Sequence, residues 1–254
     1  MIEAVALIPL WLCWGSFLNV VSYRLIRGES IIWPRSSCPQ CSHIIPWYDN
    51  IPVISWLILH GHCRFCHKPI SILYPFIELL TALVMTLLYL YVPGIYFFAY
   101  FIFFSALIVT IRSDLETMLI SRFVTLFLIP IGLFFAFMQL IPLTIFDSII
   151  GTLFGYGFLF IISKLFKVLT KKEGMGEGDL ELLAFIGSFT GLFGCWISLL
   201  LGSVIGSIIG LGYMLITKSD RAAKIPFGPF LAGAAIMYVL WQECFITLLF
   251  YQSI

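Results

Sequence analysis

Four cysteines have the spacing of a metal site. Cys38 pairs with Cys41, and Cys63 pairs with Cys66, in two C-x-x-C motifs within one polar stretch. Such pairs place four thiolate sulfurs around one Zn²⁺ at about 2.3 Å, each pair forming a chelating turn. Two redox-active pairs or unligated cysteines are the alternatives. The cytoplasmic location that is predicted below favours metal, because that compartment keeps thiols reduced.

Four thiolates would complete the coordination of zinc. We therefore expect a structural ion without an open position for a substrate. All four histidines of the chain lie in the same stretch, and we interpret them as neighbours of the metal or surface groups: His43, His60, His62 and His67.

Two aspartates have the chemistry of an acid dyad. Asp114 in IRSDLETMLIS and Asp179 in GMGEGDLELL each lie at the junction of an apolar helix with a polar segment. Carboxylates at such depth indicate function. Two carboxylates brought together share a proton, so one can activate water while the other polarises a carbonyl, which is peptide hydrolysis. The alternative is that Asp179 only caps a helix.

The composition places these residues in a membrane protein. The 254 residues are 61% hydrophobic and 11% charged, far from the composition of soluble domains. The net charge of +1 argues against nucleic acid as a partner, because no basic surface is evident. The lipid bilayer is the expected environment.

Apolar windows predict an all-α polytopic membrane protein with about eight transmembrane helices. The N-terminus lacks a basic segment and a cleavage site, so we interpret it as a retained first helix. Residues 182–216 form one uncharged run, split near Gly191, and seven or nine crossings stay open. The predicted helices are 4–25, 72–92, 95–112, 122–141, 144–167, 180–195, 196–217 and 227–250.

The basic residues predict the orientation. Threading eight helices through the bilayer puts all 14 Lys and Arg on one side, which the positive-inside rule makes cytoplasmic, with both termini outside. The long loop is then a cytoplasmic zinc-binding domain between the first two helices. We expect three parts: a first helix at 1–26, the tetracysteine loop at 27–71, and a peptidase core at 72–254.

Small residues predict where the helices pack. Gly202, Gly206 and Gly210 recur at four-residue spacing on one helix, and Gly151 and Gly155 on another. Such residues let helix backbones approach in lipid. A substrate groove is the functional alternative for these glycines.

Five motifs in order resemble the type IV prepilin peptidases, which are bifunctional leader peptidases and N-methyltransferases of the bacterial inner membrane. The similar segments are GSFLNVVSYRL (15–25), the cysteine loop, ISILYPFIELL, GMGEGDLELLAFIG with its GxGD pattern, and IPFGPFLAGA (225–234). The resemblance covers nearly the whole chain.

The resemblance implies an activity and residue roles. It implies removal of a basic leader from prepilins or pilin-like secretion proteins, bound through the leader and the hydrophobic N-terminal helix. It also implies methylation of the new N-terminus with S-adenosylmethionine, with a methyltransferase role for residues 27–71. Asp114 and Asp179 match the catalytic aspartates and the four cysteines match the metal ligands. Glu78 matches an acid whose role, an ion pair or catalysis, stays open.

Two positions depart from the family pattern. Ser121 stands where relatives usually have proline, and Glu181 stands where they usually have lysine. A glutamate beside Asp179 should disfavour its ionised form. We therefore expect a higher pH optimum than in a lysine-bearing relative.

Two other classes of protein compete with the peptidase. A proton-coupled transporter could use Asp114 and Asp179 as a relay, but would bury charges near the bilayer midplane and carry internal repeats, and the sequence shows neither. A zinc-bearing adaptor would leave the two aspartates unexplained.

Overall fold

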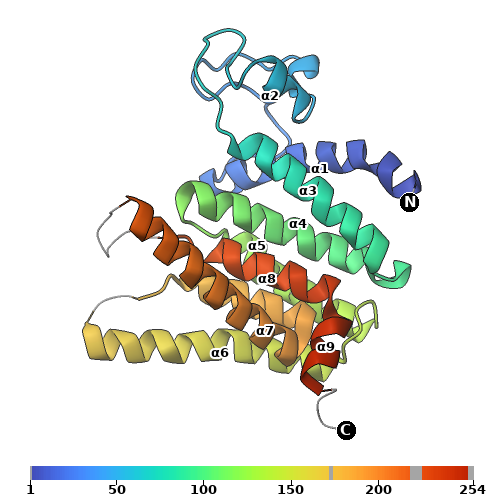
Figure 1. Ribbon diagram of the computed structural model, residues 1–254, viewed down its shortest axis with the longest axis vertical. Helices are drawn as coiled ribbons and strands as arrows, with labels where there is room; N and C mark the ends of the chain where they lie inside the picture. Colours follow the sequence, from blue (N-terminus) through green and yellow to red (C-terminus); the bar gives the residue numbers. More distant parts are fainter. Residues whose placement is uncertain (1, 172–173, 218–224, 251–254) are drawn as a thin grey trace. The chain divides into compact units, whose positions relative to one another are not determined.

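The computed structural model describes residues 2–171, 174–217 and 225–250, and within these ranges every regular element is a helix (Figure 1). The chain divides into two compact units, residues 1–93 and 94–254. Four basic residues used for the orientation, Lys172, Lys218, Arg221 and Lys224, lie outside the described residues.

The first unit pairs two long helices. Helix α1 (Ile2–Arg27) packs along α3 (Leu73–Tyr91). Gly15 makes this close approach possible, because a Cβ there would lie 2.8 Å from Cα of Glu78. One turn further along α1, the Asn19 amide donates a hydrogen bond to the carbonyl of Tyr74 at 3.1 Å. The two helices are thus joined by both packing and a polar contact.

The polar loop between α1 and α3 carries two short helices, η1 (Trp47–Asn50) and α2 (Ile54–Ile58). Ser55 of α2 donates to the carbonyl of Tyr48 at 2.8 Å, which ties the two together. The Trp56 indole donates to the carbonyl of Ile70 at 3.2 Å. These contacts give the loop a fixed path with little apolar burial.

The second unit is a helical bundle built around α7. Its helices are α4 (Gly94–Thr117), α5 (Arg122–Phe137), α6 (Ile145–Thr170), α7 (Glu177–Thr217), α8 (Gly228–Leu240) and α9 (Gln242–Phe250). Helix α7 contacts α5, α6 and α8, and α4 packs on α8. Buried rings fill the centre, where Phe103 of α4 stacks on Phe189 of α7 with centroids 4.6 Å apart.

Glycines bring α6 and α7 into backbone contact (Figure 1). A Cβ on Gly151 would lie 2.4 Å from the carbonyl oxygen of Gly187, and one on Gly155 would lie 2.5 Å from that of Leu183. On the second half of α7, a Cβ on Gly202 would lie 3.1 Å from the carbonyl oxygen of Phe230 in α8. The predicted packing role of these glycines is confirmed.

Helix α7 is broken at Gly191, which has φ 68° and ψ −173°. Glycine adopts this backbone conformation readily because it has no Cβ. Near the break, the Ser148 hydroxyl of α6 donates to the carbonyl of Ser188 at 2.5 Å. The sequence split the apolar run at this place because it is too long for one crossing.

Within the described residues, five helices are long and apolar enough to cross a membrane: α1, α3, α4, α6 and α7. Helices α5 and α8 are apolar but shorter. The number of crossings stays a prediction, although every predicted segment except the last coincides with a helix or with one half of α7. The last predicted segment, 227–250, is two helices, because α8 ends at Leu240 and Trp241 has φ −124° and ψ 30°.

Candidate active site and metal centre

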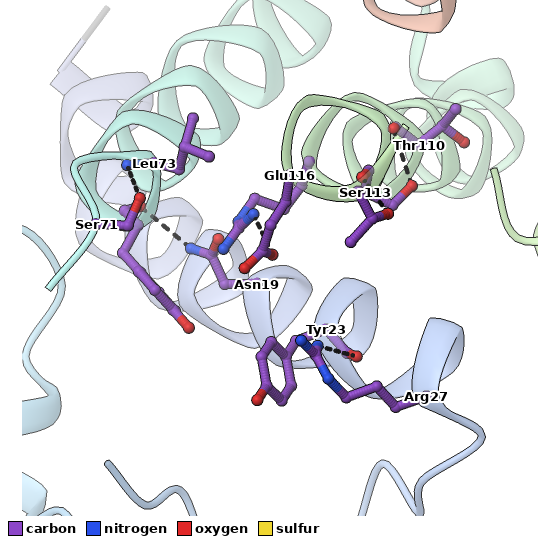
Figure 2. Close-up of polar contacts among 11 residues, drawn as sticks. Asn19, Tyr23, Arg27, Ser71, Leu73, Thr110, Ser113 and Glu116 are labelled. Carbon is purple, nitrogen blue, oxygen red and sulfur yellow. Dashed lines mark hydrogen bonds and ion pairs between the residues drawn. The ribbon is translucent and has the colours of Figure 1, made fainter. Parts of the chain in front are cut away.

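Asp114 lies in the last turns of α4. The predicted helix ended at residue 112, whereas α4 continues to Thr117 and ends where Met118 adopts a left-handed φ of 55°. Ser113 and Asp114 of this extra turn are buried, and the Ser113 hydroxyl donates to the carbonyl of Thr110 at 3.0 Å (Figure 2). Asp114 is therefore held inside a helix, with 5% of its surface exposed.

The Asp114 carboxylate is fixed by the start of α8. Its Oδ2 accepts the backbone N–H of Gly228 at 2.9 Å. That N–H belongs to the first turn of a helix, where backbone donors lack partners within the helix. A Cβ on Gly228 would lie 2.7 Å from Oδ2 and 3.2 Å from Cδ1 of Ile120. Glycine is therefore what allows the contact.

Asp179 occupies the first turn of α7, where its backbone N–H donates to the carbonyl of Gly176 at 3.2 Å. A Cβ on Gly176 would lie 3.8 Å from Oδ2 of Asp179, so the space beside this carboxylate is open. Asp179 is more exposed than Asp114.

The two aspartates come together at one end of the second unit. Ile120 links the residue that precedes Asp179 to the residue whose N–H binds Asp114. A Cβ on Gly178 would lie 3.0 Å from Cβ of Ile120, and Ile120 also contacts Gly228, the partner of Asp114. Such a pair of carboxylates can share one proton and act on a water and a carbonyl.

An ion-pair cluster stands beside Asp179. Glu181 is 3% exposed and accepts hydrogen bonds from Arg122 Nε at 2.8 Å and from the Thr125 hydroxyl at 3.1 Å. Arg122 also reaches the exposed Glu177 at 3.2 Å. The sequence interpretation treated Glu181 as an uncompensated charge. Its pairing with Arg122 offsets much of that charge, so the basis for a raised pH optimum is weaker than the sequence indicated.

The four cysteines lie together in the first unit. Each pair of ligand sulfurs lies within 4.8 Å, and the Sγ atoms of Cys38 and Cys66 are 3.9 Å apart. A tetrahedral ion at about 2.3 Å from each sulfur requires about 3.8 Å between sulfurs. These cysteines can hold a metal ion.

Two matching turns present the cysteines. The N–H of Cys38 donates to the carbonyl of His43 at 2.9 Å, and the N–H of Cys63 donates to that of Lys68 at 2.9 Å. Backbone N–H groups of Cys66 and Phe65 lower the pKa of the Cys63 thiol to about 7. The thiolate is the form of cysteine that binds a metal ion. Among the described residues this cluster contains only cysteines.

Glu78 of α3 is buried and joins the loop to the helix pair. Its Oε2 accepts the N–H of Val53 at 2.7 Å, and Ser16 of α1 also hydrogen-bonds to the carboxylate. Val53 has φ 61°, which is strained for a β-branched residue. The described residues offer no cation within ion-pair distance of this acid, so the ion-pair reading of Glu78 has no support here.

Sequence reasoning missed two partners of the aspartates. The N–H of Gly228 was signalled only by the motif IPFGPFLAGA, without a role. The partnership of Arg122 with Glu181 was not foreseen, because the two residues lie on different helices. A buried acid in an apolar helix is itself the signal that a partner must exist.

Two known protein families match this chain, and the matched parts correspond to its two compact units. Residues 10–92 match the bacterial peptidase A24 N-terminal domain, and residues 101–211 match the type IV leader peptidase family. No solved structure gave a significant match.

Three relatives are named prepilin leader peptidase/N-methyltransferase. The protein of Aeromonas hydrophila is 38% identical over 258 residues, covering 90% of this chain and 87% of the relative. That of Pectobacterium carotovorum subsp. carotovorum is 35% identical over 240 residues, 86% of each chain. That of Pseudomonas aeruginosa is 33% identical over 257 residues, 90% of this chain and 87% of the relative.

Proposed function

Because the chain belongs to the type IV leader peptidase family, we propose that it is a membrane aspartic endopeptidase that cleaves the leader from prepilins or pilin-like secretion proteins. The juxtaposition of Asp114 and Asp179 carries the proposal. Asp114 is buried and Asp179 is half-buried. The Asp114 carboxylate accepts a hydrogen bond from the N–H of Gly228 at 2.9 Å. One carboxylate, ionised, takes a proton from the attacking water. The other, protonated, donates to the scissile carbonyl.

The second activity is methylation of the new N-terminus. The names of the relatives support it, and the methyl donor that this activity requires is S-adenosylmethionine. We assign residues 27–71 a role in this step, since they form a folded loop outside the apolar helices. The donor supplies an electrophilic methyl group, which the free amine of the cleaved product accepts.

Zinc is the metal proposed for Cys38, Cys41, Cys63 and Cys66. The spacing of their sulfurs and the two matching turns support four-coordinate binding. Four thiolates leave no coordination position for a substrate, so the ion is structural. It holds together the two ends of a loop that buries little apolar surface.

The protein belongs in the bacterial inner membrane as a multi-pass chain, which the apolar helices and the family support. We place the aspartates and the cysteine loop on the cytoplasmic side and both termini outside, because the basic residues gather on one side. Substrates then bind through the basic leader and their hydrophobic N-terminal helix. The transporter alternative is not favoured, since the two acids lie at helix ends.

The test is leader cleavage in cells that express the protein with one prepilin, read by mass analysis of the mature N-terminus. Asp114→Asn and Asp179→Asn should each abolish cleavage at unchanged membrane abundance. Asp147→Asn is a matched control, because Asp147 is an exposed acid in the first turn of α6 whose carboxylate accepts a hydrogen bond from the hydroxyl of Thr144. Cleavage by either aspartate variant at the wild-type rate would contradict the proposal.

A further inference from the structure

We propose that Arg122 and Glu181 form a positioning pair that sets the rotation of the first turn of α7 and so holds Asp179 against Asp114. The inference rests on the proposed peptidase function. It adds two residues that do not touch the substrate but determine where one catalytic carboxylate lies.

The first argument is how completely Glu181 is bound. Arg122 Nε and its NH2 group each lie 2.8 Å from Oε1, and the Thr125 hydroxyl donates to Oε2 at 3.1 Å. The Glu181 side chain is 4% exposed, whereas that of Arg122 is 65% exposed. Both oxygens of a buried carboxylate are therefore anchored on α5. Removing Arg122 would leave the buried carboxylate of Glu181 without a compensating charge, which is strongly destabilising.

The second argument is helical geometry. Residues 177 and 181 are four apart and lie on one face of α7, and Arg122 contacts both. Asp179 stands two residues from each, about 200° around the helix axis. Because both oxygens of Glu181 are anchored on α5, Asp179 must point away from α5. The contacts of Ile120 with Gly178 and Gly228 join this turn of α7 to the partner of Asp114.

The third argument is the short connection between α4, which carries Asp114, and α5, which anchors Glu181. Helix α4 ends at Thr117 and α5 begins at Arg122. Ile120, two residues before Arg122, packs on Gly178 and on Gly228. One segment therefore leads from the helix of Asp114 to the anchor of Glu181. A displacement of α7 by about 1 Å would misalign the dyad, and such errors can lower a rate about 100-fold.

Charge reversal with rescue tests the pair. Leader cleavage is measured with the purified full chain and a prepilin, giving kcat and KM separately across pH. Arg122→Glu and Glu181→Lys each place like charges together and should lower kcat at least about tenfold, with KM within about twofold. The double variant restores an opposite-charge pair and should recover kcat to within about threefold of wild type.

Two conservative variants separate positioning from other effects. Glu181→Gln keeps acceptor and shape, so it should retain kcat within about threefold and leave the pH profile unchanged. Glu177→Gln removes an exposed partner of the same arginine, 84% exposed, and should change kcat less than twofold. If the reversals fail to fold, judged by thermal unfolding, these variants and Arg122→Gln, expected to lose kcat at least about fivefold, decide the question.

The outcomes are distinguishable from failure of the proposed function. If the wild-type chain does not cleave the prepilin, the peptidase proposal itself falls. If the wild type cleaves and folded single reversals retain full kcat, or the folded double variant is as slow as the worse single variant, the positioning role is overturned. A pH profile that shifts with Glu181→Gln at unchanged kcat would show instead that Glu181 acts through its charge.

Discussion

Replacing Gly228 by alanine is the sharpest probe of the site. The added Cβ would lie 2.7 Å from Oδ2 of Asp114, so either the carboxylate or the start of α8 must move. The 2.9 Å hydrogen bond from the Gly228 N–H is then lost. A hydrogen bond to a charged group contributes about 1.5–3 kcal/mol. At about 1.36 kcal/mol per factor of ten, leader cleavage should slow by about 10- to 100-fold.

The same helix offers a matched control. Gly233 also lies in α8, and nothing stands within 4 Å of a Cβ built on it. Alanine is the better helix former by about 1 kcal/mol, so Gly233→Ala should keep the rate and the stability. The assay is the initial rate of leader cleavage by purified protein, with the folded fraction measured by thermal unfolding. A folded Gly228→Ala enzyme with the wild-type rate would refute the argument.

Three further outcomes are expected. Purified wild type should carry about one zinc per chain by elemental analysis, and Cys63→Ser should lose it; wild type without bound zinc contradicts the assignment. Gly151→Ala should lower the free energy of unfolding by about 1–3 kcal/mol, because its Cβ would press on a backbone carbonyl. Gly157→Ala, with open space around it, should not. Glu78→Ala removes the acceptor of the Val53 N–H, so hydrogen-exchange protection of that amide should fall by an equivalent of about 1–3 kcal/mol. Glu78→Gln keeps an acceptor and should retain most of the protection. An equal loss of protection in both variants would show that this hydrogen bond does not hold the loop.

The sequence predicted those features that depend on local spacing. The two C-x-x-C pairs indicated a cysteine cluster because each pair closes its own turn. The apolar windows located the helices because a span needs a fixed length of apolar chain. The break near Gly191 followed from the same length argument, and glycine supplies the φ of 68° found there.

Contacts between distant segments could not be predicted in this way. The sequence did not show that Gly228 donates to Asp114, because the two are joined only by the packing of α8 on α4. Glu181 was considered beside Asp179 alone, and its partner Arg122 belongs to another helix. The end of α4 was placed too early because polar residues normally mark a helix end at a membrane surface. Here Thr110, Ser113 and Asp114 are buried instead.

The break at Gly191 also bears on how the protein is made. Residues 177–190 extend about 21 Å at about 1.5 Å per residue, less than the roughly 30 Å of hydrocarbon in a bilayer. A segment this short is poorly held by lipid alone. Its backbone at Leu183 and Gly187 packs on Gly155 and Gly151 of α6, and α6 is synthesised before α7. The growing chain thus supplies the docking partner before the segment that depends on it, and Asp179 reaches its place only late in biogenesis.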